Sequence, residues 1–191
     1  MADHPPIETY PELDSTNAEA RRRAEAGETG PVWITAARQT AGRGRRGRGW
    51  STGAGNLAAT LLTTTDLPPA EAAQLSFVAA LAAADLAETC LGPGAARLKW
   101  PNDVLVFGGK AVGILVESGA RADGRLWMAV GVGVNLAHSP KDVERPATAF
   151  AEHLATAAPR PAEALEVLAS RFETWRRLWT SQGFAHIATA W

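Results

Sequence analysis

Residues 42–50 hold four arginines and four glycines and end on a tryptophan, in the order Gly-Arg-Gly-Arg-Arg-Gly-Arg-Gly-Trp. Because glycine adds backbone entropy and no packing surface, this stretch predicts a flexible loop rather than a helix or a strand. Such a loop offers guanidinium and backbone N–H groups, which are the donors that bind carboxylates and phosphates. Taken alone, the stretch also fits a solvated charged loop or a Gly-Arg segment that binds RNA.

Lys110 is the second residue that could do chemistry. It follows a hairpin signal at Gly108-Gly109 and begins a strand expected over residues 110–117, and Asp103 begins the apolar run on the other side of that hairpin. A lysine in an otherwise buried strand is costly unless an anion lies beside it. Lys110 therefore indicates an anion site, and a turn position with its amine in water is the alternative.

The elements that must position these residues follow from the hydrophobic pattern. Strands are expected at residues 32–37, 56–65, 103–107, 110–117 and 126–136, and helices at 18–26, 70–90 and along an apolar stripe made by Leu165, Leu168, Phe172, Trp175 and Trp179. Residues 1–13 and 139–146 are expected to be polar segments, and a short helix to begin within 147–150. This order predicts an α+β fold with helices packed against a mixed β-sheet, in a single domain over residues 1–191.

Smaller signals refine this outline. Thr16 and Glu19 have capping-box spacing before the first helix, and Gly27 is its expected end. Gly131 and Gly133 lie on the same face of the last expected strand, where the missing side chains let a ligand or backbone come close.

Composition excludes several classes of function. The 191 residues are 46% hydrophobic, and 19 basic against 20 acidic residues give a net charge of −1, which does not favour a general nucleic-acid partner. A single cysteine, Cys90, forms no internal disulfide and suits the cytoplasm, and it is expected to be a small apolar packing residue. No apolar run of about 18 residues suggests a membrane span, and the four scattered histidines show no zinc-ligand spacing.

Five motifs, in order and at close to the expected spacing, resemble the biotin–protein ligase family. They are Ser15-Thr16-Asn17, the run from Gln39 to Trp50, Lys99-Trp100-Pro101-Asn102-Asp103, the run from Gly109 to Glu117, and Gly131-Val132-Gly133-Val134-Asn135. The resemblance covers residues 10–190 and implies the family's catalytic-domain fold, which is similar to that of class II synthetases. In that family the biotin carboxylate attacks ATP to give biotinyl-AMP and pyrophosphate. A lysine of a biotin carboxyl carrier protein domain of a carboxylase then takes the biotin.

The resemblance also implies a role for each motif residue. The residues it implies for biotin are Ser15, Thr16, Asn17, Gln39, Gly42, Arg43, Arg45, Lys110 and Gly113. Those it implies for the nucleotide are Arg43, Arg46, Arg48, Trp50 and Asn135, with Asn135 near the adenine. Lys110, Arg45 and Asp103 are the implied catalytic residues, ATP and Mg²⁺ are the implied cofactors, and the arginine loop is expected to close over the adenylate. For Trp50 and Trp100, packing as wall and core residues is preferred over a role in ligand binding.

The sequence departs from the family pattern at both ends. Fewer than 20 residues precede the first expected helix, so a monofunctional ligase without a DNA-binding domain is expected, with no nucleic-acid or membrane partner. The family usually continues past the position of Trp191 into a small β-barrel of roughly 40–60 residues, so adenylation is better supported than carrier transfer. The alternatives are a lipoate or octanoate enzyme of the same fold, and a non-catalytic biotin-binding core. The family often pairs subunits through sheet edges, and the residues do not decide whether this chain forms a homodimer.

Overall fold

The computed structural model describes residues 3–141, 143 and 145–191 and contains one mixed β-sheet in that part of the chain. The strands lie in the order β1-β2-β3-β7-β6-β5-β4, and every neighbouring pair is antiparallel except β1 with β2. Their bounds are β1 Ile7–Tyr10, β2 Val32–Ala36, β3 Leu57–Thr65, β4 Ala96–Lys99, β5 Asp103–Val106, β6 Gly109–Ala120 and β7 Leu126–Val134.

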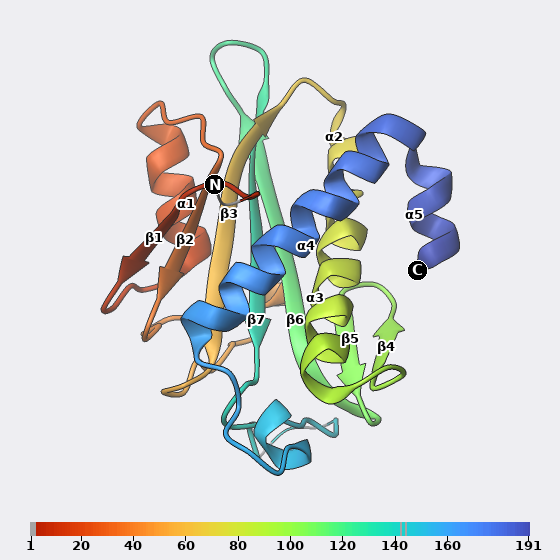
Figure 1. Ribbon diagram of the computed structural model, residues 1–191. Coiled ribbons are helices and arrows are strands. Elements are labelled where there is room, and N and C mark those ends of the chain that lie inside the picture. The colour runs from red at the N-terminus through yellow and green to blue at the C-terminus, as the bar shows by residue number, and fades with distance from the viewer. Residues whose placement is uncertain (1–2, 142, 144) are drawn as a thin grey trace.

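Helices cover both faces of this sheet. The α-helices are α1 Thr16–Glu25, α2 Pro69–Ala72, α3 Leu75–Leu91, α4 Pro161–Gln182 and α5 Phe184–Ala190, and two 3₁₀ turns are η1 Arg45–Gly47 and η2 Phe150–His153. Figure 1 shows α4 crossing one face of the sheet diagonally beside α3, with α1 against the sheet at the β1–β2 side. The longest strands, β3, β6 and β7, pair with one another in the middle of the sheet and form the floor on which the site is built.

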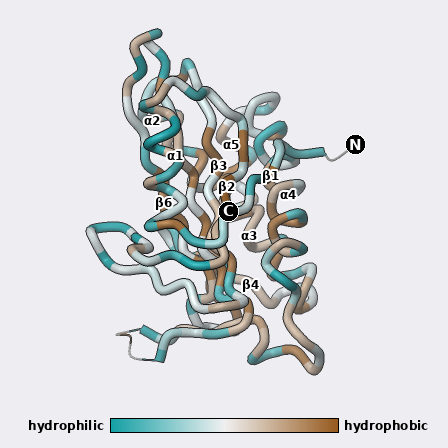
Figure 2. Tube along the Cα trace, turned by 90° about the vertical axis from the view of Figure 1, so that its left-hand side faces the viewer, coloured by the Kyte–Doolittle hydropathy of each residue, from teal (hydrophilic) through white to brown (hydrophobic). Residues whose placement is uncertain are grey.

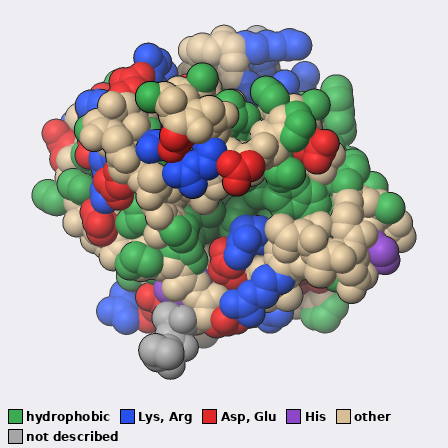
Figure 3. Space-filling model, turned by 90° about the horizontal axis from the view of Figure 1, so that it is seen from above, with side chains coloured by type: hydrophobic (Ala, Val, Ile, Leu, Met, Phe, Trp, Pro, Cys, Tyr) green, Lys and Arg blue, Asp and Glu red, His purple; other side chains and the backbone are tan. Residues whose placement is uncertain are grey.

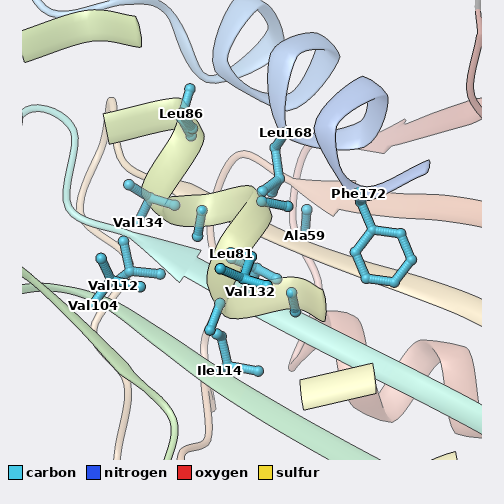
Figure 4. Packing of buried hydrophobic residues seen from close by; sticks show 14 of the residues in the cluster. Ala59, Leu81, Leu86, Val104, Val112, Ile114, Val132, Val134, Leu168 and Phe172 are labelled. Carbon is cyan, nitrogen blue, oxygen red and sulfur yellow. The ribbon is translucent and has the colours of Figure 1, made fainter. Parts of the chain in front are cut away.

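The main hydrophobic core lies between the sheet and the helices α3 and α4. Leu81 and Leu86 of α3, Leu168 and Phe172 of α4 and the valines of the central strands belong to one buried cluster, in which Phe172 lies beside Ala59 (Figure 4). Trp33 is fully buried and meets Phe172 edge-to-face, with 5.6 Å between the ring centroids. Because burying one such side chain stabilises the fold by about 1.5–3 kcal/mol, this face holds most of the apolar stabilisation. The hydrophobic segments gather in the same interior region in Figure 2.

The opposite face carries a much smaller core under α1. Ala20 and Ala24 of α1 pack on Ile34, Leu62 and a few neighbours. Alanine at these positions lets the helix approach the sheet closely, and α1 packs on β2, β3 and β7. Asn17 at the start of α1 reaches β6, and the site lies beside this end of the helix, over β3, β6 and β7.

Most of the expected elements are confirmed. The α+β class and the mixed sheet hold, the hairpin at Gly108 joins β5 to β6, and the apolar stripe of α4 faces the core, with Trp175 partly buried. The expected 70–90 helix is two helices, because the chain breaks between α2 and α3 at Ala73-Gln74. The strands β1 and β4 and the helix α5 were not expected. Each is short, and a short element gives little periodicity to detect.

The capping-box prediction was wrong. The residue before α1 is Ser15, and neither it nor Thr16 makes a side-chain cap. Thr16 is the first residue of the helix, and its hydroxyl hydrogen-bonds with other side chains, while Glu19 pairs with Arg22 instead. The polar segment expected at 139–146 includes positions 142 and 144, and that expected at 1–13 includes positions 1–2. All four positions lie outside the described residues.

One segment in the described part of the chain, Pro69–Leu91, is long and apolar enough to cross a membrane on length and composition alone. The sequence reading expected no such run. Alanine explains the difference, because it raises the mean hydropathy to 1.3 without adding large side chains. Half of the segment is buried inside the domain, and α3 packs against α4 and the sheet as a core helix.

Candidate active site

A cavity of about 420 Å³ lies on the α1 face of the sheet, within the usual size range of small-molecule sites. Its floor is formed by β3, β6 and β7, and its rim by the N-terminus of α1, the arginine loop and the turn between β4 and β5. The predicted site residues on its wall are Ser15, Thr16, Asn17, Gln39, Arg43, Arg45, Arg46, Arg48, Trp50, Asp103, Lys110 and Gly113. The fold thus brings together twelve of the fourteen residues predicted from the sequence.

One end of the cavity is lined by neutral polar groups at the start of α1. The Thr16 backbone N–H donates to Oε1 of Gln39 at 2.8 Å, and the Gln39 amide donates to Thr52 at 2.9 Å. Thr60, fully buried on β3, lies 2.8 Å from the Thr16 hydroxyl and 2.7 Å from Oδ1 of Asn17. An amide oxygen only accepts hydrogen bonds, so the Thr60 hydroxyl must donate to Asn17 and accept from Thr16.

Asn17 connects this network to the sheet floor. Its Nδ2 donates to the Leu115 carbonyl at 3.2 Å and to Glu117 at 2.8 Å, which fixes the orientation of the amide. Its Oδ1 lies directly over Gly131, where a Cβ atom would come within 2.0 Å of it. The sequence predicts that a ligand or backbone comes close to this glycine, whereas the group that lies against it is the Asn17 side chain of α1.

The other end of the cavity is cationic and depends on an irregularity in β6. The pairing of β5 with β6 shifts so that Val104 faces Val112 and Leu105 faces Lys110, which leaves Ala111 unpaired. The bulge places Ala111 and Val112 in the core and turns Lys110 toward the cavity. The Lys110 ammonium lies 2.6 Å from Oδ1 of Asp103, so the anion that a strand lysine requires is present.

The arginine loop is a narrow hairpin. Gly42 O accepts from Trp50 N at 2.9 Å, Gly44 N donates to Arg48 O at 2.7 Å, and η1 forms its tip. A Cβ at Gly42 would come within 2.3 Å of the Trp50 carbonyl, so Gly42 closes the base of the hairpin and does not line the cavity. Arg43 reaches Glu117 at 3.3 Å.

Arg45, at the tip of the hairpin, donates to the Asn102 side chain at 3.3 Å across the cavity. Asn102 belongs to the turn between β4 and β5 and is itself held by a 2.8 Å hydrogen bond to the Ile114 carbonyl. The hairpin therefore spans the mouth of the cavity to the turn opposite it.

Trp50 lies flat on the floor over two glycines. A Cβ at Gly113 would come within 2.7 Å of the indole, and one at Gly133 within 2.4 Å, so both glycines are needed for the ring to lie here. The Lys110 ammonium lies 5.6 Å from the ring centroid, within cation–π range. The indole Nε1 is buried and has no hydrogen-bond partner among the described residues. Trp50 is thus both a packing residue and part of the wall.

Some residues lie elsewhere than the sequence suggested. Asn135 is buried and does not line the cavity, and its amide donates to backbone carbonyls instead. Trp100 lies at the rim with 71% of its surface exposed, so the core role considered for it is wrong. Sequence reasoning missed Thr60, a lone threonine in an apolar strand with no local signal, and Arg145, which lines the cavity from the polar segment after β7.

Other reactive groups lie outside this site. Cys90 is on α3, where burial raises the pKa of its thiol, so it is a poor nucleophile. Within the described ranges, no group of three or more His, Cys, Asp or Glu side chains could hold a metal ion. Basic and acidic side chains are mixed on the face in Figure 3 rather than forming one positive field.

The cavity offers neutral hydrogen-bonding groups at one end and cationic groups at the other, a lining that suits a polar organic molecule with an anionic end. Residues 11–135 match the model of the Biotin/lipoate A/B protein ligase family. The chain is 48% identical over 184 residues to a biotin–[acetyl-CoA-carboxylase] ligase of Paracoccus denitrificans, covering 93% of this chain and 76% of the relative. It is 35% identical to the Mycobacterium tuberculosis ligase of the same name, covering 89% of this chain and 65% of that one.

The fold is also similar to that of a solved ligase. The biotin protein ligase from Aquifex aeolicus in complex with biotin and ATP superposes with a TM-score of 0.76 at 28% identity, over 94% of this chain and 74% of that one. The chain belongs to the Biotin/lipoate A/B protein ligase family.

Proposed function

We propose that this protein activates biotin with ATP to form biotinyl-AMP and pyrophosphate, and then transfers biotin to a lysine of a carrier protein. The names of both relatives and the biotin and ATP bound to the Aquifex protein support biotin as the acid within this family. The side chains that line the cavity supply the chemical argument for this reaction.

The observation that carries the proposal is the polarity of the cavity along β6. Its neutral hydrogen-bonding end lies beside Leu115, and its cationic end lies at Lys110, earlier along the same strand. A ligand with a neutral polar ring, an aliphatic tail and a terminal carboxylate matches this order. We assign Ser15, Thr16, Asn17 and Gln39 to the ureido ring. Gly113, with the Trp50 indole that lies on it, belongs to the floor beneath the tail.

Activation brings a carboxylate to a triphosphate, and the repulsion between the two anions must be offset. In this step a carboxylate oxygen forms a bond to the α-phosphorus. The bond from that phosphorus to the bridging oxygen breaks, and the electron pair leaves with pyrophosphate. Lys110 and Arg45 provide donors where this charge develops, and such fixed donors are usually the largest part of catalysis in a phosphoryl-group reaction. Arg43, Arg46, Arg48 and Trp50 also line the cavity, and we assign them to the nucleotide.

Mg²⁺ is part of this proposal. It binds through one or two carboxylates together with substrate phosphates, so a dedicated cluster of protein ligands is not required. Asp103 is the carboxylate on the cavity wall and would hold it, and the ion would neutralise phosphate charge. Asp103 meanwhile keeps the Lys110 ammonium at one position by its 2.6 Å contact.

The arginine hairpin serves as a lid in this proposal. An acyl-adenylate is lost to water unless solvent is excluded until the acceptor arrives. Arg45 already joins the hairpin to the opposite rim through Asn102, and a bound phosphate would add a stronger, charge-assisted contact to the same arginine. Gly42 contributes by keeping the base of the hairpin narrow.

We further propose that the acceptor is a biotin carboxyl carrier protein domain, that the chain works as one catalytic domain in the cytoplasm, and that nucleic acid and membranes are not its partners. The open edges of the sheet at β1 and β4 are where a second copy would pair. Analytical ultracentrifugation with and without biotin and ATP would measure that association.

The experiment that tests the activity is biotin-dependent exchange of labelled pyrophosphate into ATP, with lipoate and octanoate as controls. We expect exchange with biotin alone. Lys110→Ala should reduce exchange by roughly 10²–10³-fold, as removal of one transition-state donor does elsewhere, while the folded structure persists. Exchange with lipoate or octanoate in place of biotin would show that biotin is not the substrate. Unchanged exchange in Lys110→Ala would show that Lys110 has no part in the reaction.

A further inference from the structure

Arg145 reaches the cavity from a segment that none of the five motifs includes. It lies between β7 and η2 and lines the same cavity as Lys110 and the arginine hairpin. An arginine is the side chain best suited to bind phosphate oxygens, because its planar fork makes two parallel hydrogen bonds. A role in binding requires that the fold hold the backbone of Arg145 at a fixed position.

The residues after Arg145 are paired with the backbone of Lys110. Lys110 N donates to Pro146 O at 2.8 Å, and Thr148 N donates to Lys110 O at 3.0 Å, so that Lys110 and Ala147 form a parallel bridge. Arg145 therefore precedes by one residue the point at which its segment joins the strand of the proposed catalytic lysine. Two cations far apart in the sequence are brought to the same end of the cavity by this bridge.

Asn135 also joins the two segments of the bridge between Lys110 and Ala147. Its side chain is 3% exposed, and Nδ2 donates to the Thr148 carbonyl at 3.2 Å and to the Lys110 carbonyl at 3.4 Å. One buried amide thus joins the segment of Arg145 to the strand of Lys110. The Thr148 hydroxyl bonds to Glu152 at 3.0 Å and lies 2.8 Å from His153, which fixes the segment to η2.

The position of Arg145 along the cavity indicates which part of a ligand it meets. Its segment lies beside Lys110, at the opposite end from the neutral groups of α1. With biotin oriented as proposed, the carboxylate and the α-phosphate lie near Lys110. The remaining phosphates must then lie within the basic surroundings at that end.

We propose that Arg145 binds the β- and γ-phosphates of ATP, and hence the departing pyrophosphate, and that Asn135 is the positioning residue that holds Arg145 and Lys110 in register. This inference rests on the proposed function, because it names the residue that binds the leaving group of that reaction. It does not involve the biotin end of the cavity.

Binding of inorganic pyrophosphate and of ATP, measured by isothermal titration calorimetry, tests the proposal without requiring activity. Arg145→Gln should weaken pyrophosphate binding about tenfold or more, the usual consequence of losing a charge-assisted hydrogen bond, and Arg145→Lys should restore part of it. Biotin affinity should not change. Lys141→Gln is the matched control, since it removes a positive charge from the same segment outside the cavity lining.

Asn135→Ala, alone and combined with Arg145→Gln, tests the positioning role. Asn135→Ala should weaken pyrophosphate binding in the native background and have little further effect when Arg145 is already glutamine. Independent, additive losses would reject the coupling. If Asn135→Ala does not fold, the Arg145 variants decide the proposal alone.

Equal pyrophosphate affinity in Arg145→Gln and the native protein would overturn the proposal. A protein that binds pyrophosphate through Arg145 but exchanges none with biotin would instead reject the proposed function and leave Arg145 as a residue that binds pyrophosphate.

Discussion

Replacing Gly131 with alanine tests how rigidly the neutral end of the cavity is built. A Cβ at this position would lie 2.0 Å from Oδ1 of Asn17 and 3.2 Å from the Leu115 carbonyl. Neither atom yields easily, because the Asn17 amide is held at both ends and Leu115 is in the paired interior of β6. The substitution must therefore displace Asn17.

The size of the effect follows from the hydrogen bonds that Asn17 would lose. Its amide accepts from Thr60 at 2.7 Å and donates to Leu115 O and Glu117 at 3.2 Å and 2.8 Å. At about 0.5–1.5 kcal/mol for each bond, loss of the set lowers the free energy of unfolding by about 1.5–4.5 kcal/mol. Biotin affinity should fall as well, since Asn17 lines the cavity.

Urea unfolding followed by circular dichroism, together with calorimetric biotin binding, measures both effects. Gly53→Ala is the matched control, because its added methyl would meet only ordinary contacts at 3.9 Å and beyond. Asn17→Ser shortens the side chain that collides, so adding Gly131→Ala to that variant should cost less than it does in the native protein. An unchanged stability and biotin affinity in Gly131→Ala would refute this reasoning, and so would fully additive losses in the double variant.

Two further predictions follow from single contacts. Arg45→Gly removes the contact to Asn102 and a phosphate donor, so biotinyl-AMP should leave the enzyme roughly tenfold faster in a quench assay, and unchanged release would reject the lid role. Arg22 hydrogen-bonds to Asp14 and lowers the pKa of that carboxyl to about 2. The contribution of this pair to the free energy of unfolding should therefore be fully present above about pH 4 and be lost as the pH falls toward 2. The half-exposed pair limits this contribution to below about 1 kcal/mol. Asp14→Asn should flatten the acid limb of the unfolding curve, and an identical limb would contradict the assignment.

The parts of the fold that the sequence predicted are those with long, regular hydrophobic patterns. The α4 stripe and the strands β2, β3 and β7 bury their apolar residues on expected faces. The site residues belong to short sequence motifs rather than to periodic hydrophobic patterns, and the folded sheet brings these motifs together. The start of α1, the arginine hairpin, the β4–β5 turn and β6 are distant in the sequence and meet only because β3, β6 and β7 are neighbours.

What the sequence did not reveal depends on contacts between distant residues. The bulge at Ala111 decides which way Lys110 points, and simple strand alternation would have placed Lys110 and Gly113 on opposite faces. Thr60 looks like any other β-branched residue until Thr16 and Asn17 lie above it. Arg145 lies in a polar segment and acquires a role only through the pairing of Ala147 with Lys110.

Because Lys110 is paired with Asp103, Lys110 and the arginines of the cavity should have different roles. At 2.6 Å the two charges largely cancel, so the pair adds little net attraction for a polyanion. A lysine ammonium has three N–H donors, and contact with Asp103 leaves others to aim at an incoming oxygen. The net positive charge that draws in a carboxylate and a triphosphate must then come from the arginines of the hairpin and from Arg145. Neutralising Asp103 with asparagine should accordingly tighten binding of inorganic pyrophosphate while slowing adenylation, because the lysine gains free charge and loses its fixed position.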